Sequence, residues 1–126
     1  VGKTILWSLP EEKSITILDR LELTPFTKQT ITNRSELEAV LQEDSIRGYS
    51  LDKEELEEGL ECIALPLTIE EYHFYGSMSF SGSVERFTDE VVPTLVETLR
   101  QTREKILQEI KTPLRTGRGG LYAIKP

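Results

Sequence analysis

The residues best suited to chemistry lie in one stretch, RGYSLDKEELEEGLECIALP, from Arg47 to Pro66. It holds one aspartate and five glutamates, and these acids precede Cys62, the only cysteine of the chain. Carboxylates beside a thiol are compatible with a catalytic site, a metal site or a ligand pocket. The apolar residues that follow Cys62 favour a core strand, so the acidic cluster is expected at the edge of the core.

Two chemical alternatives use Cys62 directly. A cysteine enzyme would need Cys62 as nucleophile and His73 as base, but no motif links these positions and no third residue is evident to orient the base. A metal site could combine Asp52, Cys62 and His73, which is fewer ligands than a structural zinc site uses. We therefore expect no catalytic residue, no metal ion and no cofactor, and the chain is not predicted to be an enzyme.

A ligand pocket is the third alternative, and it depends on two predicted strands. The stretches CIALPL and HFYGSMSFS alternate along the chain, which is typical of an antiparallel hairpin. Small residues would line one of its faces and leave volume for a ligand among a few hydrogen-bonding groups. These residues are Cys62, Ala64, Ser77, Ser79 and Ser81. On the residues alone, the preferred interpretation of Cys62 is a small buried side chain, and Ser79 and Ser81 taken by themselves suit the water-facing side of an edge strand better.

Helices are expected to cover the apolar side of this hairpin. Pro10 followed by two glutamates favours a helix start. Residues 14–21 are interpreted as helix from their spacing, although their β-branched residues also suit a strand. Asn33 with Glu36 three residues later forms a capping-box pattern, and Gly48 is the expected end of that helix.

The longest helix is expected near the end of the chain. It begins close to Thr88 and carries apolar residues at three- and four-residue spacing as far as Ile110. The predicted fold class is therefore α+β, an antiparallel sheet with helices packed on one face. We assign residues 1–110 to one domain and expect residues 111–126 to form a loosely ordered tail, because they contain Gly and Pro without periodicity.

The composition limits the functions that are open to the chain. Of its 126 residues, 37% are hydrophobic and 29% are charged, as in an ordinary globular domain. No window is apolar enough to cross a bilayer, and the start VGKTILWSLPEE does not resemble a signal peptide, so we expect a cytoplasmic location and no membrane partner. The net charge of -7 argues against direct binding to DNA phosphates.

Five segments occur in an order that resembles a known family. They are Gly2-Lys3 at a helix start, LTPFTKQTITN, the stretch from Arg47 to Pro66, SMSFSG and RFTDE. Together they span Val1 to about Ile110 and resemble the effector-binding domain of IclR-type transcriptional regulators. The long acidic stretch is far more specific than a lone short motif.

The resemblance implies a GAF-like fold and a function in gene regulation. Such regulators join an N-terminal winged helix-turn-helix to a GAF-like domain that binds small organic acids. The family's domain has further strands ahead of the helix at Gly2, so the resemblance implies a sheet truncated on its N-terminal side. DNA would be bound only through the absent N-terminal domain, and the full-length protein would be a homodimer or homotetramer.

Carried over position by position, the family's ligand contacts fall on seven residues. They are Val1, Gly2, Asp52, Leu60, Cys62, Ser79 and Ser81. The chain departs from the family at the hairpin turn, where Glu71 and Tyr72 stand in place of a common glycine. It departs again from Lys111 onward, where no counterpart can be placed.

The implied site must tolerate an anion beside an acidic loop. Inward-pointing acids would repel a carboxylate ligand, so most of the loop is expected to face water. The residues assigned to solvent are Glu54, Glu55, Glu57, Glu58 and Glu61. Backbone N–H groups at the Gly2 helix start, together with the hydroxyls of Ser79 and Ser81, would bind the carboxylate. Asp52 would accept a hydrogen bond from a ligand hydroxyl or a water, or share a proton with an acidic ligand.

A function of another class stays open at this point. The domain could be an oligomerisation module of the regulator whose pocket is vestigial. A truncated sheet would expose a strand edge, and an exposed edge favours association with another chain.

Overall fold

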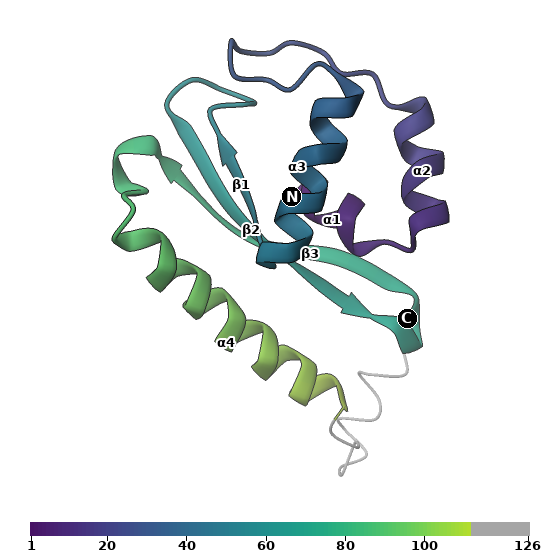
Figure 1. Ribbon diagram of the computed structural model, residues 1–126. Helices are drawn as coiled ribbons and strands as arrows, with labels where there is room; N and C mark the ends of the chain where they lie inside the picture. Colours follow the sequence, from purple (N-terminus) through teal and green to yellow (C-terminus); the bar gives the residue numbers. More distant parts are fainter. Residues whose placement is uncertain (112–126) are drawn as a thin grey trace.

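The computed structural model describes residues 1–111 as helices packed around one small sheet (Figure 1). The α-helices are α1 (Gly2–Ser8), α2 (Glu11–Arg20), α3 (Arg34–Arg47) and α4 (Val91–Lys111). The strands are β1 (Ser50–Lys53), β2 (Leu60–Ile69) and β3 (Phe74–Ser83), and the short 3-10 helices are η1 (Glu70–Tyr72) and η2 (Val84–Arg86). Apart from Lys111, which ends α4, the predicted tail lies outside the described residues.

The three strands form one antiparallel sheet in the order β1-β2-β3. The hairpin of β2 and β3 was predicted from the alternation of its residues and is confirmed. Strand β1 was not predicted, because SLDK is short and carries one apolar residue, Leu51, which gives no readable alternation. The acidic loop between β1 and β2 is therefore the turn of a hairpin.

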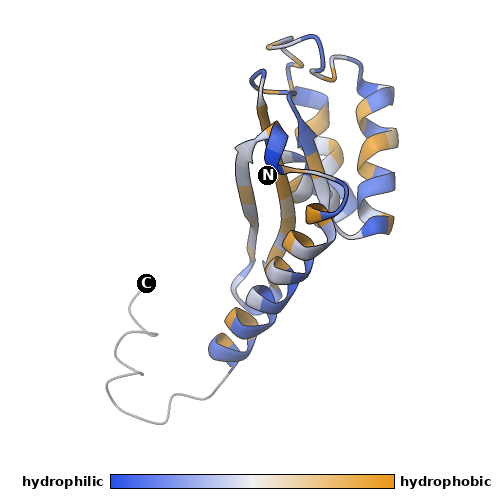
Figure 2. Cartoon of the chain, turned by 90° about the vertical axis from the view of Figure 1, so that its left-hand side faces the viewer, coloured by the Kyte–Doolittle hydropathy of each residue, from blue (hydrophilic) through white to orange (hydrophobic). Residues whose placement is uncertain are grey.

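One face of the sheet carries large apolar side chains and is covered by α4. Ile63 and Leu65 of β2 are both 0% exposed and form a core with Val96 and Leu99 of α4. Orange and blue residues alternate along α4 in Figure 2, as expected of an amphipathic helix with one face on the sheet. This face matches the predicted layer of helix on sheet.

The other face is also covered by a helix, so the expectation of helices on one face only was wrong in this respect. Helix α1 contacts both β2 and β3, and the indole Nε1 of Trp7 donates to the hydroxyl of Ser50 at 2.8 Å. Ser50 pairs with Ala64, which places α1 on the side of the small residues (Figure 1). Small side chains let a helix approach the sheet closely, and Thr4 of α1 is 0% exposed.

Helices α2 and α3 build a second core on top of α1. It contains Leu6 of α1, Leu18 of α2, and Leu37 and Leu41 of α3. The order is therefore α4, sheet, α1, with α2 and α3 outermost (Figure 1). The α+β class with an antiparallel sheet is confirmed.

The predicted helix ends agree with the structure. The side chain of Asn33 accepts a hydrogen bond from the backbone N–H of Glu36, as an N-cap should. Gly48 ends α3 with φ +91°, in the left-handed region that favours glycine. Within residues 1–111, no helix is both long and apolar enough to cross a membrane.

Glu61 is buried on the α4 side of β2, which corrects the prediction that it faces water. It is 3% exposed, and within the described residues its Oε2 atom has no hydrogen-bond partner. Burial raises the pKa of its carboxyl above the ordinary value, and Lys53 opposes this shift. Strand alternation explains the position, because Glu61 precedes the small-residue position Cys62 and must point to the opposite face.

The substitution Glu61→Gln should make the stability of the chain less dependent on pH. A carboxyl whose pKa is raised by folding binds more protons in the folded state, so folding stability falls as pH rises from about 4.5 through the folded pKa. Glutamine resembles the protonated form, so the stability of the variant relative to wild type should increase as pH rises from 4 to 8. Urea denaturation between pH 4 and 8 measures the difference. Glu57→Gln, at an exposed position, is the control, and a stability difference that stays constant across this range would contradict the expectation.

Candidate functional site

The sheet register brings three of the predicted site residues into one row. Asp52 of β1 pairs with Cys62 of β2, and Cys62 pairs with Ser81 of β3. Directly paired residues on antiparallel strands point to the same face, with their Cβ atoms about 5 Å apart. A carboxylate, a thiol and a hydroxyl are therefore adjacent on the face that α1 contacts.

The remaining predicted residues come from the same sheet face and from the start of α1. Ser79 pairs with Ala64 in the next row, and Leu60 lies two residues before Cys62 on the same face. Val1 and Gly2 form the start of α1, which crosses this face. The seven residues thus come from α1 and all three strands, and only their strand pairing could be anticipated from alternation.

The residues of this row differ in how far they are exposed to solvent. Cys62 is 8% exposed, Asp52 is half-buried, and Ser79 and Ser81 on the edge strand are exposed. A ligand carboxylate could therefore reach the serine hydroxyls from the β3 side. The burial of Cys62 is also what is expected of a small packing side chain, which was the alternative interpretation of this residue.

Asp52 is held by its own loop. Its Oδ1 atom accepts a hydrogen bond at 2.9 Å from the backbone N–H of Glu55, three residues later in the chain, which is a local side-chain-to-backbone bond. A carboxylate has a second oxygen with further acceptor capacity, so Asp52 can still accept from a ligand hydroxyl. The loop thus fixes the carboxylate on the same face as Cys62.

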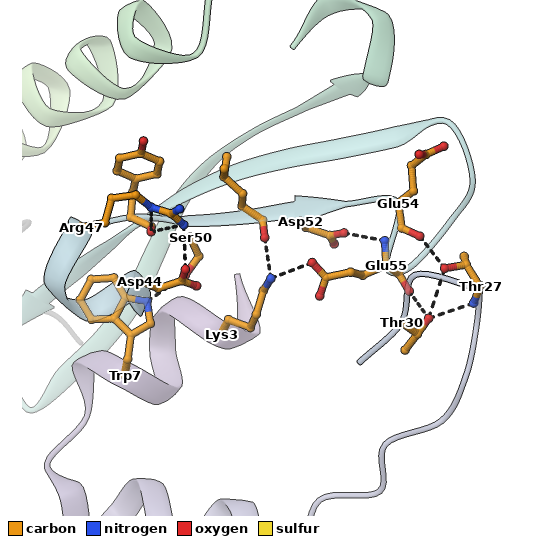
Figure 3. A network of polar contacts seen from close by, with 12 residues as sticks. Lys3, Trp7, Thr27, Thr30, Asp44, Arg47, Ser50, Asp52, Glu54 and Glu55 are labelled. Atoms are coloured by element: carbon orange, nitrogen blue, oxygen red, sulfur yellow. Dashed lines mark hydrogen bonds and ion pairs between the residues drawn. The ribbon is translucent and has the colours of Figure 1, made fainter. Parts of the chain in front are cut away.

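Lys3, which is not among the predicted site residues, joins α1 to this loop. Lys3 donates from Nζ to the carbonyl of Leu51 and forms an ion pair of 2.8 Å with Glu55 (Figure 3). The Lys3 and Glu55 side chains are only 14% and 21% exposed. Gly2-Lys3 is one of the segments that carry the family resemblance. The contact between Lys3 and Glu55 could not be predicted, because the two residues are 52 positions apart and no local pattern links them.

The acidic stretch is therefore only partly solvated, in contrast to the prediction. Glu57 and Glu58 are exposed as expected. Glu55 is paired with Lys3, and the side chain of Glu54 accepts from the backbone N–H of Gly59 at 2.9 Å. Each inward-turned acid except Glu61 has a partner that lowers the cost of placing its charge near the site.

The geometry does not favour a cysteine–histidine pair. Cys62 lies seven residues before Ile69, which pairs with Phe74 beside His73 at the far end of the hairpin. At about 3.3 Å per residue, the two side chains are separated by roughly 23 Å along the strands. Within residues 1–111, no group of three His, Cys, Asp or Glu side chains is arranged to hold a metal ion.

The chain was compared with known families and proteins. A family model described as the bacterial transcriptional regulator IclR C-terminal region matches residues 1–108. The HTH-type transcriptional regulator XynR of Escherichia coli K12 is 31% identical over 101 residues, which are 80% of this chain and 40% of XynR. The transcriptional repressor IclR of the same organism is 35% identical over 91 residues, which are 72% of this chain and 33% of the repressor.

Solved structures with the same fold agree. The C-terminal domain of the Escherichia coli regulator KdgR is 33% identical and superposes with a TM-score of 0.77, over 84% of this chain and 65% of that domain. Thermotoga maritima IclR is 34% identical with a TM-score of 0.78, over 83% of this chain and 42% of the solved chain. The chain thus spans about 40% of the length of the curated relatives. On this evidence the chain belongs to the family of IclR C-terminal domains of bacterial transcriptional regulators.

Proposed function

We propose that this chain is the ligand-sensing part of an IclR-type transcriptional regulator. It binds a small organic acid and alters DNA binding by a separate winged helix-turn-helix domain. Control of this kind requires that the ligand bind one conformation of the regulator more tightly than the other. The family membership supports the regulatory class, and the sheet row supports the site.

The observation that carries the proposal is the register of the sheet. It aligns Asp52, Cys62 and Ser81 across three strands, on the face that α1 contacts. These groups are far apart in the sequence, and their alignment provides hydrogen-bonding groups beside small side chains. This combination is typical of small-molecule sites.

Each group has a distinct task in the proposed site. Val1 offers no side-chain cap, so the first N–H groups of α1 can donate to a ligand carboxylate beside Gly2. Ser79 and Ser81 donate to the same carboxylate from the exposed edge strand. Asp52 accepts from a ligand hydroxyl, while Leu60 and Cys62 provide the apolar floor.

The alternative of an oligomerisation module has one observation in its favour. Strand β3 is an edge of the described sheet, and its ten residues carry no charged side chain. Uncharged edges pair readily with other strands. The two functions differ in whether a ligand is required, and a screen for ligand binding therefore distinguishes them.

A thermal-shift screen of small organic acids should find a ligand that stabilises the chain. A ligand at 100 times its Kd adds about 2.7 kcal/mol to the stability of the folded state. The panel contains mono- and dicarboxylates, hydroxy acids, sugar acids and aromatic acids.

Ser79→Ala should weaken binding of every hit about tenfold, because the lost hydroxyl contacts the shared carboxylate. Ser45→Ala, at an exposed position of α3, is the matched control. A folded sample that binds no acid yet associates stably would favour the oligomerisation module.

Asp52→Asn should change ligand choice rather than overall affinity. Asparagine keeps an oxygen that can accept from the Glu55 N–H, so this hydrogen bond is retained while the negative charge is removed. Hydroxy acids should lose affinity relative to their analogues without the hydroxyl, and dicarboxylates should gain. Calorimetric Kd values across the panel measure this preference. Equal losses for Asp52→Asn and Ser79→Ala over all ligands would contradict separate roles for the two residues.

A further inference from the structure

We infer that Lys3 is a positioning residue that sets ligand specificity by holding Asp52 in place through Glu55. The inference rests on the proposed function, because it assigns a role in the same site. Lys3 itself is not expected to touch the ligand. Lys3 joins two elements of the proposed site, the start of α1 and the loop after β1.

The ammonium group of Lys3 joins three backbone segments at one point. Lys3 is the second residue of α1, directly after Gly2. Its Nζ donates to the carbonyl of Leu51 in β1 and to the carboxylate of Glu55 in the loop. Figure 3 shows these two contacts meeting at the ammonium group. Any movement of α1 relative to β1 would therefore break one or both of them.

Glu55 transmits this restraint to Asp52. The Glu55 backbone N–H donates to Asp52 Oδ1 at 2.9 Å, and the Glu55 side chain pairs with Lys3 at 2.8 Å. One residue thus contacts the candidate ligand group through its main chain and the α1 start through its side chain. Releasing the side chain removes one of the restraints on the segment whose N–H donates to Asp52, and the hydrogen bond should then open more often.

The far side of the loop is fixed independently, so Lys3 acts on a short segment. The hydroxyl of Thr27 donates to the carbonyl of Glu54, and the hydroxyl of Thr30 donates to the carbonyl of Glu55 (Figure 3). The loop is therefore anchored at its carbonyl groups with or without Lys3. Loss of Lys3 is expected to change the local orientation of Asp52 without unfolding the loop.

Charge gives the pair a second effect on specificity. Glu55 is largely buried, and without Lys3 its carboxylate would lie unpaired near the site of an anionic ligand. Like charges repel, and the repulsion is strongest where water is excluded. The pair thus orients Asp52 and also neutralises the nearest competing acid.

The test compares the binding of lactate and propionate, which differ by one hydroxyl group, to the full chain. Wild type should prefer lactate by about tenfold, as expected of one hydrogen bond to a charged acceptor. Lys3→Met should reduce this ratio to about twofold, and Lys3→Arg, which keeps the charge, should restore most of it. Lys28→Met, which removes an exposed lysine charge from the 27–30 loop, is the matched control and should leave the ratio unchanged.

A second readout requires no ligand. Hydrogen exchange followed by NMR reports the protection of the Glu55 amide, which donates to Asp52. Lys3→Met and Glu55→Gln should both accelerate this exchange about tenfold, whereas Lys28→Met should not. Glu55→Gln provides a second variant in case the loss of Lys3 prevents folding.

The outcomes separate this inference from the proposed function. If wild type binds neither acid, the proposed function fails for this ligand class, while the amide exchange still decides the role of Lys3. If Lys3→Met lowers the melting temperature but leaves both the selectivity ratio and the exchange of Glu55 unchanged, the lysine is merely structural and the inference is overturned. Non-additive losses in the Lys3→Met, Glu55→Gln double variant would support it.

Discussion

The alternation of side-chain size along β2 is the constraint on which the remaining structure depends. Ile63 and Leu65 point to one face and fill the core beneath α4, whereas Cys62 and Ala64 point to the other face and leave room. A shift of one residue in register would exchange the two faces and place the bulky side chains against α1. The layers of helices, the position of the candidate site and the burial of Glu61 all follow from this pattern.

Much of the local structure could be predicted because its causes lie within a few residues. The Asn33 cap, the left-handed Gly48 and the β2–β3 hairpin each depend on chemistry that is visible in a short window. The family resemblance added the candidate site residues. The register of the sheet then brought Asp52, Cys62 and Ser81 into one row, which no single segment specifies.

The predictions that the structure corrects concern features that depend on contacts between segments distant in the sequence. Glutamates in a loop usually face water, yet Glu55 is paired with a lysine of α1 and Glu61 is buried on the opposite face of β2 from Cys62. Composition cannot distinguish these residues from the exposed Glu57 and Glu58. The placement of α1 against the small-residue face was missed for the same reason, since Trp7 and Ser50 meet across 43 positions of sequence.

The two edge strands of the sheet, β1 and β3, differ in how easily a further strand could pair with them. Along β1, the ammonium of Lys3 donates a hydrogen bond to the main-chain carbonyl of Leu51, and helix α1 lies beside that edge. Along β3, ten uncharged residues border the described sheet. An incoming strand would have to displace an ammonium to join β1, whereas β3 has no charged side chain of its own to oppose pairing. Any extension of this sheet, from the same polypeptide or another, is therefore directed to β3, so that new strands would be added next to Ser79 and Ser81 and would narrow the access to them.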